Sequence, residues 1–473
     1  MAVEGELHVV MLPWLAMGHL IPFLELSKRL ARKGIVVSFV STPRNIDRVQ
    51  SRIPESLSPL IHLIRLPLPP LHNLPPSAEA TIDLPVEEVH FLKAAFDGLE
   101  APFDDFLLSA SPDWIICDFA SYWLPPLALK YGIPCAYLSL FSASSMAFFG
   151  PAARMLGLPN KWETSSTDFT SVPKWIPYPS NVVLRKHEIK RILHSVHQGG
   201  NASKVLDGYR LGSVVQGCDV VLIRSCNKLE SNALRLLETD IYEKPIIPVG
   251  LLPPYVEEME ESMDADIREW LDRQKPESVV YVALGTEACL TQEEINELAH
   301  GLELSELPFF WVFRKLSVLD AINVELPSGF KERIGDRGVV WEGSWAPQVN
   351  ILAHPSVGGF LTHCGWNSII EALGFGRALI LFPYLSEQGL NARMMESSNV
   401  GLEIPRDEHE GSFTSKSVAE SLKMVMVEEE GEHLRSNARE IKQIFGDRDL
   451  HDGYIDNLIH YLKNHTKLKE NQQ

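Results

Sequence analysis

The sequence predicts an α/β protein with two doubly wound, Rossmann-like domains that face each other across a cleft. Short β-rich runs alternate with longer helical patterns along the chain, which is typical of parallel sheets built from βαβ units. The alternation occurs in two series, separated by an acidic, proline-containing stretch at 253–276. The 473 residues are enough for two domains of ordinary size. Because doubly wound sheets bind ligands at the carboxyl ends of their strands, we expect the site between the two domains.

The first series, residues 1–252, begins with the clearest βαβ unit. An apolar strand at 8–12 and a turn precede a helical pattern at 19–33, which Gly34 ends, and a second strand follows at 35–40. Further strands of this domain are expected at 61–66, 114–117, 135–139 and 220–224.

The second series, residues 277–450, follows the linker at 253–276 and repeats the alternation. Its strands are expected at 279–284, 309–313, 339–341, 358–361 and 378–382. Its helices are expected at 292–303, 348–353, 367–375, 390–397, 415–427 and 432–445. We expect a last helix near 454–463, within a C-terminal segment, 451–473, that packs back on the first domain.

The charge balance argues against one broad class of partner. The chain carries 62 acidic and 43 basic residues, for a formal net charge of −19. Nucleic acid binding requires a basic surface, so we expect no nucleic acid partner. A net charge of this sign otherwise reflects solubility and does not identify a substrate.

Cysteine usage and the N-terminal residues indicate a cytoplasmic protein. The six cysteines are scattered, with no CxxC pair, as is typical of reduced thiols in the cytosol. The apolar stretch at 9–26 lacks the basic flank of a signal peptide, because Glu4 and Glu6 precede it, and Pro13 and Pro22 interrupt it. No run approaches the roughly 20 apolar residues of a membrane span. We therefore expect no stable membrane insertion, and a monomer is the default expectation.

The strand expected at 358–361 leads through a turn into a helix, an arrangement that suits a diphosphate. Backbone N–H groups at a helix start, together with the helix dipole, attract phosphate. Gly365 lets the backbone approach the ligand, and His363 can add charge or a hydrogen bond. Asn367 and Ser368 add side-chain donors. By itself, a junction of this kind is more often plain scaffold.

Two further side chains near this junction suit a nucleotide. Glu371 lies one turn along the same helix, and its carboxylate only accepts hydrogen bonds, as the two hydroxyls of a ribose require. Trp345 offers a flat face for a pyrimidine, and such stacking contributes about 1–3 kcal/mol per base. Together with the junction, they predict a nucleoside diphosphate site in the second domain.

A general base is predicted where the first strand of the first domain meets its helix. His19 follows Gly18 at this turn, and Asp118 follows the strand expected at 114–117. An imidazole titrates near neutral pH and can take the proton of an attacking hydroxyl. A buried carboxylate behind the ring would orient it and stabilise its cation. A lone histidine at a helix start is more often a capping or surface residue, so the prediction depends on the pairing with Asp118.

The stretch at 345–388 carries the most specific signal in the chain. It reads WAPQVNILAHPSVGGFLTHCGWNSIIEALGFGRALILFPYLSEQ and resembles, from first residue to last, the box that defines the plant secondary-product glycosyltransferases. The segments around His19 and Asp118 and the sequence VYVALGT at 280–286 extend the resemblance over the whole chain. The resemblance implies the GT-B fold, an acceptor-binding N-terminal domain, a C-terminal domain that binds a UDP-sugar as co-substrate, and no other cofactor.

Individual roles follow from this resemblance alone. The backbone of Ala346 contacts uracil, and Gln348 contacts the ribose. Glu387 and Gln388 grip the hydroxyls of the transferred sugar, with help from Trp366. The resemblance also implies the remaining assignments: His19 and Asp118 as the catalytic pair, Gly18 beside the donor, Thr286 on the diphosphate, and Ser142 near the donor phosphate or sugar.

The last two residues of the box bear on the donor sugar. Family members commonly use glucose when the box ends in Gln, as it does at Gln388, so UDP-glucose is the first candidate donor. Glu387 stands where Asp is more usual, which implies a slightly different grip on the sugar. UDP-rhamnose is the alternative, because it is accepted by members of the subgroup that extends the sugars of glycosides. Three segments resemble that subgroup, at 12–19, 41–46 and 248–254.

Aromatic side chains close to the motifs would form an apolar acceptor pocket, although each is individually more often part of a core. These are Trp14, Phe119, Tyr122, Phe141, Phe148 and Tyr384. Two proline-rich stretches, 66–85 and 172–179, are either surface connections or walls of that pocket. Such a pocket suits flavonoids, terpenoids, their glycosides or xenobiotic phenols as small-molecule acceptors.

The expected reaction is a single in-line displacement at the anomeric carbon, which inverts its configuration and needs no metal. No DxD-like signature lies near the box, and no HExxH pair occurs in the chain. A nicotinamide-dependent oxidoreductase would share the sheets, but no GxGxxG opens either domain. A non-catalytic sugar-nucleotide-binding protein would keep the box, and the presence of both His19 and Asp118 argues against it.

Overall fold

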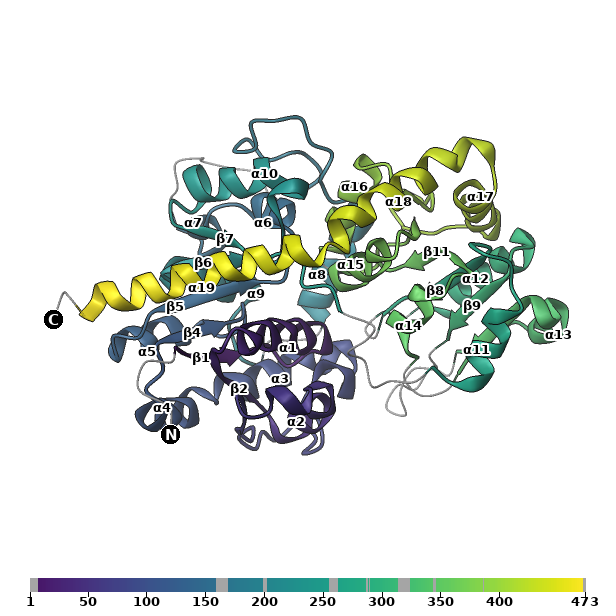
Figure 1. Cartoon of the computed structure of the whole chain (residues 1–473). Helices are drawn as coiled ribbons and strands as arrows, with labels where there is room; N and C mark the ends of the chain where they lie inside the picture. The colour runs from purple at the N-terminus through teal and green to yellow at the C-terminus, as the bar shows by residue number, and fades with distance from the viewer. Residues whose placement is uncertain are drawn as a thin grey trace.

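The protein is described here by a computed structural model. The residues that it describes are 7–158, 169–198, 202–254, 263–285, 288, 290–313, 324–342, 346–385 and 387–470. Two parallel sheets organise the chain, one in each half (Figure 1).

The first sheet has the strand order β3-β2-β1-β4-β5-β6-β7, and all its neighbours are parallel. Its strands are β1 His8–Leu12, β2 Val36–Ser41, β3 Ile61–Arg65, β4 Trp114–Cys117, β5 Cys135–Ser139, β6 Val220–Ile223 and β7 Ile246–Pro248. The chain runs outward in one direction from β1 to β3 and in the other from β4 to β7. The strand order therefore reverses between β1 and β4, and such a switch point is where an open α/β sheet presents loop residues to a ligand.

The second sheet has the order β10-β9-β8-β11-β12-β13 and is also parallel throughout. Its strands are β8 Val279–Ala283, β9 Phe309–Val312, β10 Gly338–Trp341, β11 Val357–Thr362, β12 Ala378–Leu381 and β13 Gly401–Glu403. Its switch point lies between β8 and β11. The doubly wound α/β class predicted from the sequence is confirmed.

Helices connect the strands and cover the sheets. In the first half they are α1 Met17–Arg32, α2 Pro43–Val49, α3 Val89–Asp97, α4 Glu100–Ala110, α5 Leu124–Lys130, α6 Ala143–Phe149, α7 Ala152–Met155, α8 Lys186–Gln198, α9 Asp207–Gly217 and α10 Asn227–Leu236. In the second half they are α11 Ala265–Asp272, α12 Gln292–Ser305, α13 Phe330–Ile334, α14 Gln348–Ala353, α15 Trp366–Gly374, α16 Gln388–Ser397, α17 Ser415–Met426, α18 Glu432–Phe445 and α19 Arg448–Glu470.

The central strands are apolar along their whole length because helices cover both faces of each sheet. All residues of β1 except its first are buried, and all of β4, β8 and β12 are buried. Helix ends follow local rules as well: Thr291 and Glu294 form a reciprocal capping box at the start of α12. This packing leaves the loops after the strands to carry the polar side chains of a site.

The last helix, α19, crosses from the second half of the chain onto the first (Figure 1). Arg29 of α1 pairs with Asp452 at 3.1 Å, and Lys33 pairs with Asp456 at 2.7 Å. The indole N–H of Trp114 in β4 donates to the carbonyl oxygen of Leu462 at 3.1 Å. Where one domain ends and the next begins stays a prediction.

His451, in the first turn of α19, predicts an acid-sensitive stability. The ring is fully buried, with Nδ1 accepting from the Leu251 N–H at 3.2 Å and Nε2 donating to the Phe445 carbonyl oxygen at 3.3 Å. Burial lowers its pKa from the ordinary 6.5 to about 4. The unfolded chain therefore binds a proton as the pH falls below 6.5, whereas the folded chain does not until about pH 4, so stability is lost across that window.

In urea unfolding experiments at pH 7 and pH 5, we expect the His451→Gln variant to lose about 1–2 kcal/mol less stability on acidification than the wild type. The same substitution at the exposed His409 serves as the control and should leave the pH dependence unchanged. If the wild type and His451→Gln lost the same amount of stability between pH 7 and pH 5, His451 would not be the source of the acid sensitivity.

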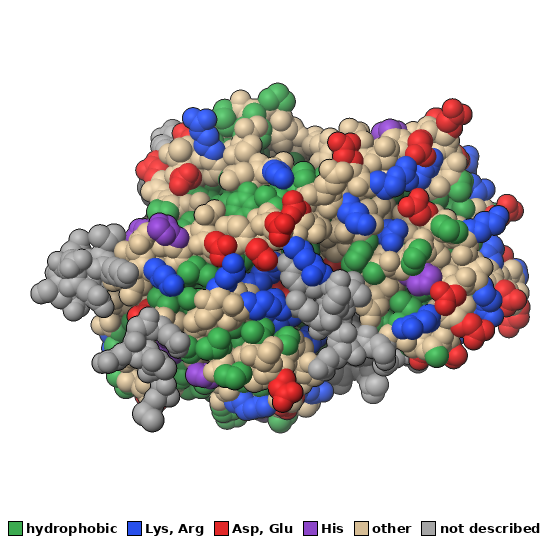
Figure 2. All heavy atoms as spheres, in the orientation of Figure 1, with side chains coloured by type: hydrophobic (Ala, Val, Ile, Leu, Met, Phe, Trp, Pro, Cys, Tyr) green, Lys and Arg blue, Asp and Glu red, His purple; other side chains and the backbone are tan. Residues whose placement is uncertain are grey.

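The surface charges and the helix lengths bear on two classes of partner, nucleic acids and membranes. Figure 2 shows Lys and Arg side chains interspersed with Asp and Glu over the described part of one face, rather than gathered in a basic stripe. Among the described residues, no helix is long and apolar enough to cross a membrane.

Candidate active site

The switch point of the first sheet brings His19 and Asp118 together. His19 lies in the first turn of α1, after β1, and Asp118 directly follows β4, which pairs with β1. His19 Nδ1 lies 2.7 Å from Asp118 Oδ2, and 21% of the His19 side chain is exposed. Because Nδ1 is engaged by the carboxylate, Nε2 is the ring atom that can take a proton from a ligand.

The carboxylate of Asp118 is held from several sides. It is 1% exposed, and its Oδ2 also accepts the Trp14 N–H at 3.0 Å. Its Oδ1 accepts the N–H of Phe119 at 2.7 Å. These hydrogen bonds hold the carboxylate in place behind the ring, where it can stabilise a protonated His19.

The switch point of the second sheet places His363 between two glycines. Gly285 follows β8, and Gly365 precedes α15 as its N-cap residue. A Cβ atom added to Gly285 would lie 2.7 Å from His363 Nε2, and one added to Gly365 would lie 2.5 Å from it. Gly285 also has a φ of +78°, which a side chain would strain. The lack of side chains at both positions therefore makes room for the ring.

The electrostatic role expected of His363 needs a correction. Burial lowers the pKa of its imidazole to about 4, so the ring is neutral at pH 7. Of the two contributions that we expected, charge and a hydrogen bond, the structure supports only the hydrogen bond.

Gly365 offers a test of this packing, because its φ of −61° suits any residue and only the His363 ring opposes a methyl group. We expect Gly365→Ala to raise the KM for the sugar donor about 10-fold or more, since overpacking typically costs about 1–3 kcal/mol. Steady-state kinetics would measure this, with Gly453→Ala as the control because its Cβ would meet nothing within 4 Å. An unchanged KM in Gly365→Ala would show that the ring position does not matter for the donor.

The ribose-binding candidates form one hydrogen-bonded cluster. Gln348 Nε2 donates to Glu371 Oε2 at 2.7 Å and to Ser368 Oγ at 3.2 Å. Burial raises the pKa of the Glu371 carboxyl. Ala346, whose backbone is expected to meet the base, lies two residues before Gln348 and is buried. The structure thus brings Ala346, Gln348, Ser368 and Glu371 together along α14 and α15.

The start of α15 touches the first half of the chain directly beside His19. Asn367 Nδ2 donates to the carbonyl oxygen of Gly18 at 2.9 Å, and Gly18 precedes His19. The side chain of Asn367 also accepts a hydrogen bond from Arg224. Trp366 is 3% exposed, and its indole N–H donates to the Arg224 carbonyl oxygen at 2.9 Å. The Trp366 indole is therefore engaged in the core, and a contact of this residue with the sugar stays a prediction.

Ser142 occupies a buried position at the contact between the halves. Its hydroxyl oxygen accepts from the Ser145 N–H at 3.2 Å and so caps α6. The same hydroxyl donates toward Asn391 Oδ1 of α16 at 3.3 Å, while Asn391 Nδ2 donates to the Cys364 carbonyl oxygen at 3.1 Å. Ser142 is completely buried in this structure, and its role near the donor stays a prediction.

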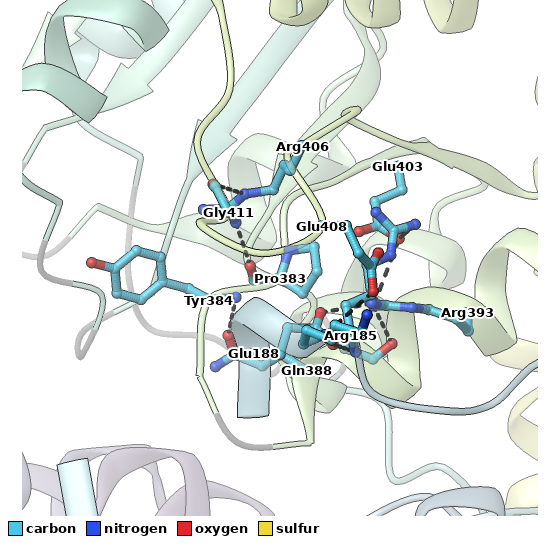
Figure 3. Close-up of polar contacts among 12 residues, drawn as sticks. Arg185, Glu188, Pro383, Tyr384, Gln388, Arg393, Glu403, Arg406, Glu408 and Gly411 are labelled. Atoms are coloured by element: carbon cyan, nitrogen blue, oxygen red, sulfur yellow. Dashed lines mark hydrogen bonds and ion pairs between the residues drawn. The ribbon is translucent and has the colours of Figure 1, made fainter. Parts of the chain in front are cut away.

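The sugar-gripping candidates lie at the start of α16. Gln388 Oε1 accepts the N–H of Tyr384 at 2.9 Å and that of Leu385 at 2.7 Å, which fixes the amide (Figure 3). Its side-chain nitrogen is then the end able to donate to a sugar hydroxyl. Glu387, the N-cap residue of α16, is half-buried beside it.

A buried network of ion pairs also holds the start of α16 in place (Figure 3). Arg393 of α16 donates to the Gly389 carbonyl oxygen at 2.6 Å and to Glu188 of α8 at 2.8 Å. Arg185 pairs with Glu403 at 3.0 Å, and burial raises the pKa of Glu403 to about 7. A side chain at Gly389 would collide with the Glu188 carboxylate at 2.5 Å. Residues next to and within α8 of the first half thus anchor the start of α16.

Of the six aromatic candidates, four are half-buried and two are buried. Phe119 is half-buried with its ring centroid 5.6 Å from that of His19, and Phe141 lies 6.4 Å from Phe119. Tyr122 and Tyr384 are also half-buried; Arg210 lies over the first ring and Arg191 over the second.

The other two aromatic candidates are buried. Phe148 is 2% exposed and belongs to the core cluster of the second sheet. Trp14 is 4% exposed and packs edge-on against Phe96 at 5.3 Å. Both rings take part in core packing, and their contact with an acceptor stays a prediction.

Two predicted residues, Thr286 and Trp345, lie outside the described residues. Conversely, the sequence analysis missed Arg224, Phe149 and Asn391. Phe149 meets Phe141 edge-on at 5.4 Å and extends the aromatic wall beside His19. For Arg224 a signal existed, because it ends a predicted strand, where site residues of such sheets gather. Among the described residues, no group of three or more His, Cys, Asp or Glu side chains could hold a metal ion.

The chain is similar to known proteins over nearly its whole length. Residues 210–453 match the family model described as UDP-glucoronosyl and UDP-glucosyl transferase, and residues 5–115 match that of a glycosyltransferase N-terminal domain. The chain is 47% identical over 463 residues to UDP-glycosyltransferase 91C1 of Arabidopsis thaliana, covering 97% of both chains. It is 41% identical over 466 residues to Soyasaponin III rhamnosyltransferase of Glycine max, covering 97% of this chain and 96% of that one. Its fold is similar to that of Phytolacca americana UGT2, solved with UDP-2fluoro-glucose and pterostilbene, with a TM-score of 0.73, 26% identity and coverage of 97% and 100%.

Proposed function

Since the chain belongs to the family 1 UDP-glycosyltransferases, hexosyltransferases with the GT-B fold, we propose that it moves glucose from UDP-glucose to a hydroxyl of a small hydrophobic plant metabolite or its glycoside. One contact carries the proposal. The hydrogen bond from Asn367 to the Gly18 carbonyl oxygen joins the start of the donor helix α15 to the turn that holds His19. A diphosphate on α15 would therefore present its sugar close to the base.

The proposed reaction is a single displacement. His19 Nε2 removes the proton of the acceptor hydroxyl, and Asp118 stabilises the resulting imidazolium through Nδ1. The acceptor oxygen bonds to the anomeric carbon as the bond from that carbon to the diphosphate oxygen breaks, and UDP leaves with the electron pair. One displacement inverts the centre, so an α-linked donor gives a β-linked product.

The start of α15 would stabilise the departing UDP. Its N-cap residue, Gly365, provides no side-chain cap, and the first-turn N–H groups and helix dipole favour an anion there. Ser368 adds a hydroxyl, and the neutral ring of His363 adds a hydrogen bond. Thr286 and Trp345 keep their proposed roles on the diphosphate and on uracil.

Glucose is favoured by Gln388, whose fixed amide presents its nitrogen beside Glu387. A UDP-rhamnose-dependent activity on a flavonoid or terpenoid glycoside is the second candidate, because a relative with 41% identity is named a rhamnosyltransferase. The half-buried rings of Phe119, Phe141 and Tyr384 favour an aromatic or terpenoid acceptor. We also propose a monomer in the cytoplasm, where the five described cysteines, all free and buried, would stay reduced.

The test is a matrix of donors and acceptors with products identified by mass. We expect transfer from UDP-glucose to flavonoid or terpenoid hydroxyls, with aglycones and glycosides assayed separately. Transfer from UDP-rhamnose alone would favour the second candidate. Nucleotide binding without turnover on any acceptor would contradict the proposal and point to a sugar-nucleotide-binding protein.

A further inference from the structure

Arg224 is a buried cation whose hydrogen-bond partners are all neutral. It directly follows β6 and is 3% exposed. Its Nε donates to the Leu251 carbonyl oxygen at 2.7 Å, and Nη2 donates to that of Leu252 at 3.3 Å. Nη1 donates to the side-chain oxygen of Asn367. Across the described parts of the chain, no carboxylate forms an ion pair with Arg224.

Other buried arginines in the chain are compensated. Arg210 makes two parallel hydrogen bonds to Asp97, at 2.6 and 2.7 Å, and Arg393 pairs with Glu188 at 2.8 Å. Arg377 is hydrogen-bonded to no carboxylate, but it donates to the last carbonyl groups of α14, at the negative end of that helix dipole. Arg224 has neither kind of bonded compensation, and the carboxylates of Glu371 and Glu25 favour its charge without a hydrogen bond to it.

The position of Arg224 makes its charge costly unless an anion joins it. Its partner Asn367 is the second residue of α15, so the guanidinium lies at the positive end of this helix dipole. Burial penalises the charge of Arg224, and the carboxylates of Glu371 and Glu25 offset that penalty only in part. Burial lowers the pKa of Arg224 only to about 10, so the charge persists at pH 7.

The groups that we have placed around the diphosphate are otherwise uncharged. The N–H groups of α15, the Ser368 hydroxyl and the neutral His363 ring donate hydrogen bonds but bring no full positive charge. A diphosphate in a UDP-sugar carries two negative charges, and metal-free stabilisation of a leaving group requires fixed positive charge or dipoles beside it.

We infer that Arg224 supplies the counter-charge for the donor diphosphate, so that the sugar nucleotide is held by a cation of the first domain as well as by α15 of the second. The inference rests on the proposed function. It makes Arg224 a donor-binding residue contributed by the acceptor-binding domain, and it couples binding of the diphosphate to contact between the two domains.

The test compares UDP with uridine, which lacks the phosphates. By calorimetry we expect Arg224→Gln to weaken UDP binding about 10- to 100-fold more than uridine binding. Arg224→Lys keeps the charge but loses the forked donors. We expect this variant to weaken UDP binding about 3- to 10-fold more than uridine binding. Should Arg224→Gln fail to fold, the lysine variant decides by the same comparison.

Arg210→Gln is the matched control, since it removes a buried arginine of the same domain that has a carboxylate partner. It should lower the melting temperature without changing the UDP-to-uridine ratio. Equal losses for UDP and uridine in the Arg224 variants, or no loss for either, would overturn the inference and leave the proposed function standing. Failure of the wild type to bind UDP would overturn both.

Discussion

Replacing His19 with alanine is expected to lower kcat by about 10²- to 10⁴-fold while UDP binding is unchanged, because a general base contributes about this factor. His19 is bound to Asp118 through Nδ1, and it lies at the turn that Asn367 contacts from the second half of the chain. The variant removes the proton acceptor and leaves the nucleotide site intact. Single-turnover rates with saturating donor, together with calorimetry for UDP, would measure the two quantities.

His354→Ala is a suitable control for that experiment. His354 lies in the same 345–388 stretch but bonds to Ser356 at 2.8 Å and Asp272 at 3.1 Å, away from the proposed reacting groups. We expect it to change stability more than kcat. Near-normal turnover of His19→Ala with the donor bound would refute the assignment of the base.

The second large effect is expected for Asp118→Asn, with a loss of kcat of up to about 10⁴-fold. Asp118 accepts from His19 and the Trp14 N–H on one oxygen and from the Phe119 N–H on the other. An amide accepts on one side only, so its NH₂ group must face either the ring or a backbone N–H. The ring then loses the orientation and charge stabilisation that a base requires.

A variant with both substitutions tests whether Asp118 acts through His19. If Asp118 acts through His19, then His19→Ala with Asp118→Asn should be no slower than His19→Ala alone, because the two residues act as a unit. Multiplicative losses would mean that Asp118 acts independently of the ring. The thermal stability of each variant would show whether the loss of the buried hydrogen bonds contributes.

Most of the strands could be predicted from sequence because they depend on local patterns. Runs such as those at 9–12, 114–117 and 279–284 are apolar throughout, as is typical of buried parallel strands. The edge strands β7 Ile246–Pro248 and β13 Gly401–Glu403 were missed. Each has three residues, which is too short for a periodicity to be recognised.

The site residues also divide into those that follow predictable strands and those that depend on tertiary packing. His19, Asp118, His363 and Gly365 follow strands, so their positions could be inferred from the order of elements alone. Arg224 was hidden as the last residue of a strand expected at 220–224, and its partners come from far along the chain. Likewise, the burial of Trp366 and Phe148 depends on tertiary packing between the halves, which no local pattern reports.

A solved complex of the protein with UDP and an acceptor would test the central claim most directly. The account predicts the diphosphate at the start of α15, between that helix and Arg224, with the acceptor hydroxyl within hydrogen-bond reach of His19 Nε2. A nucleotide bound away from α15, or an acceptor hydroxyl facing some other group than His19, would contradict it.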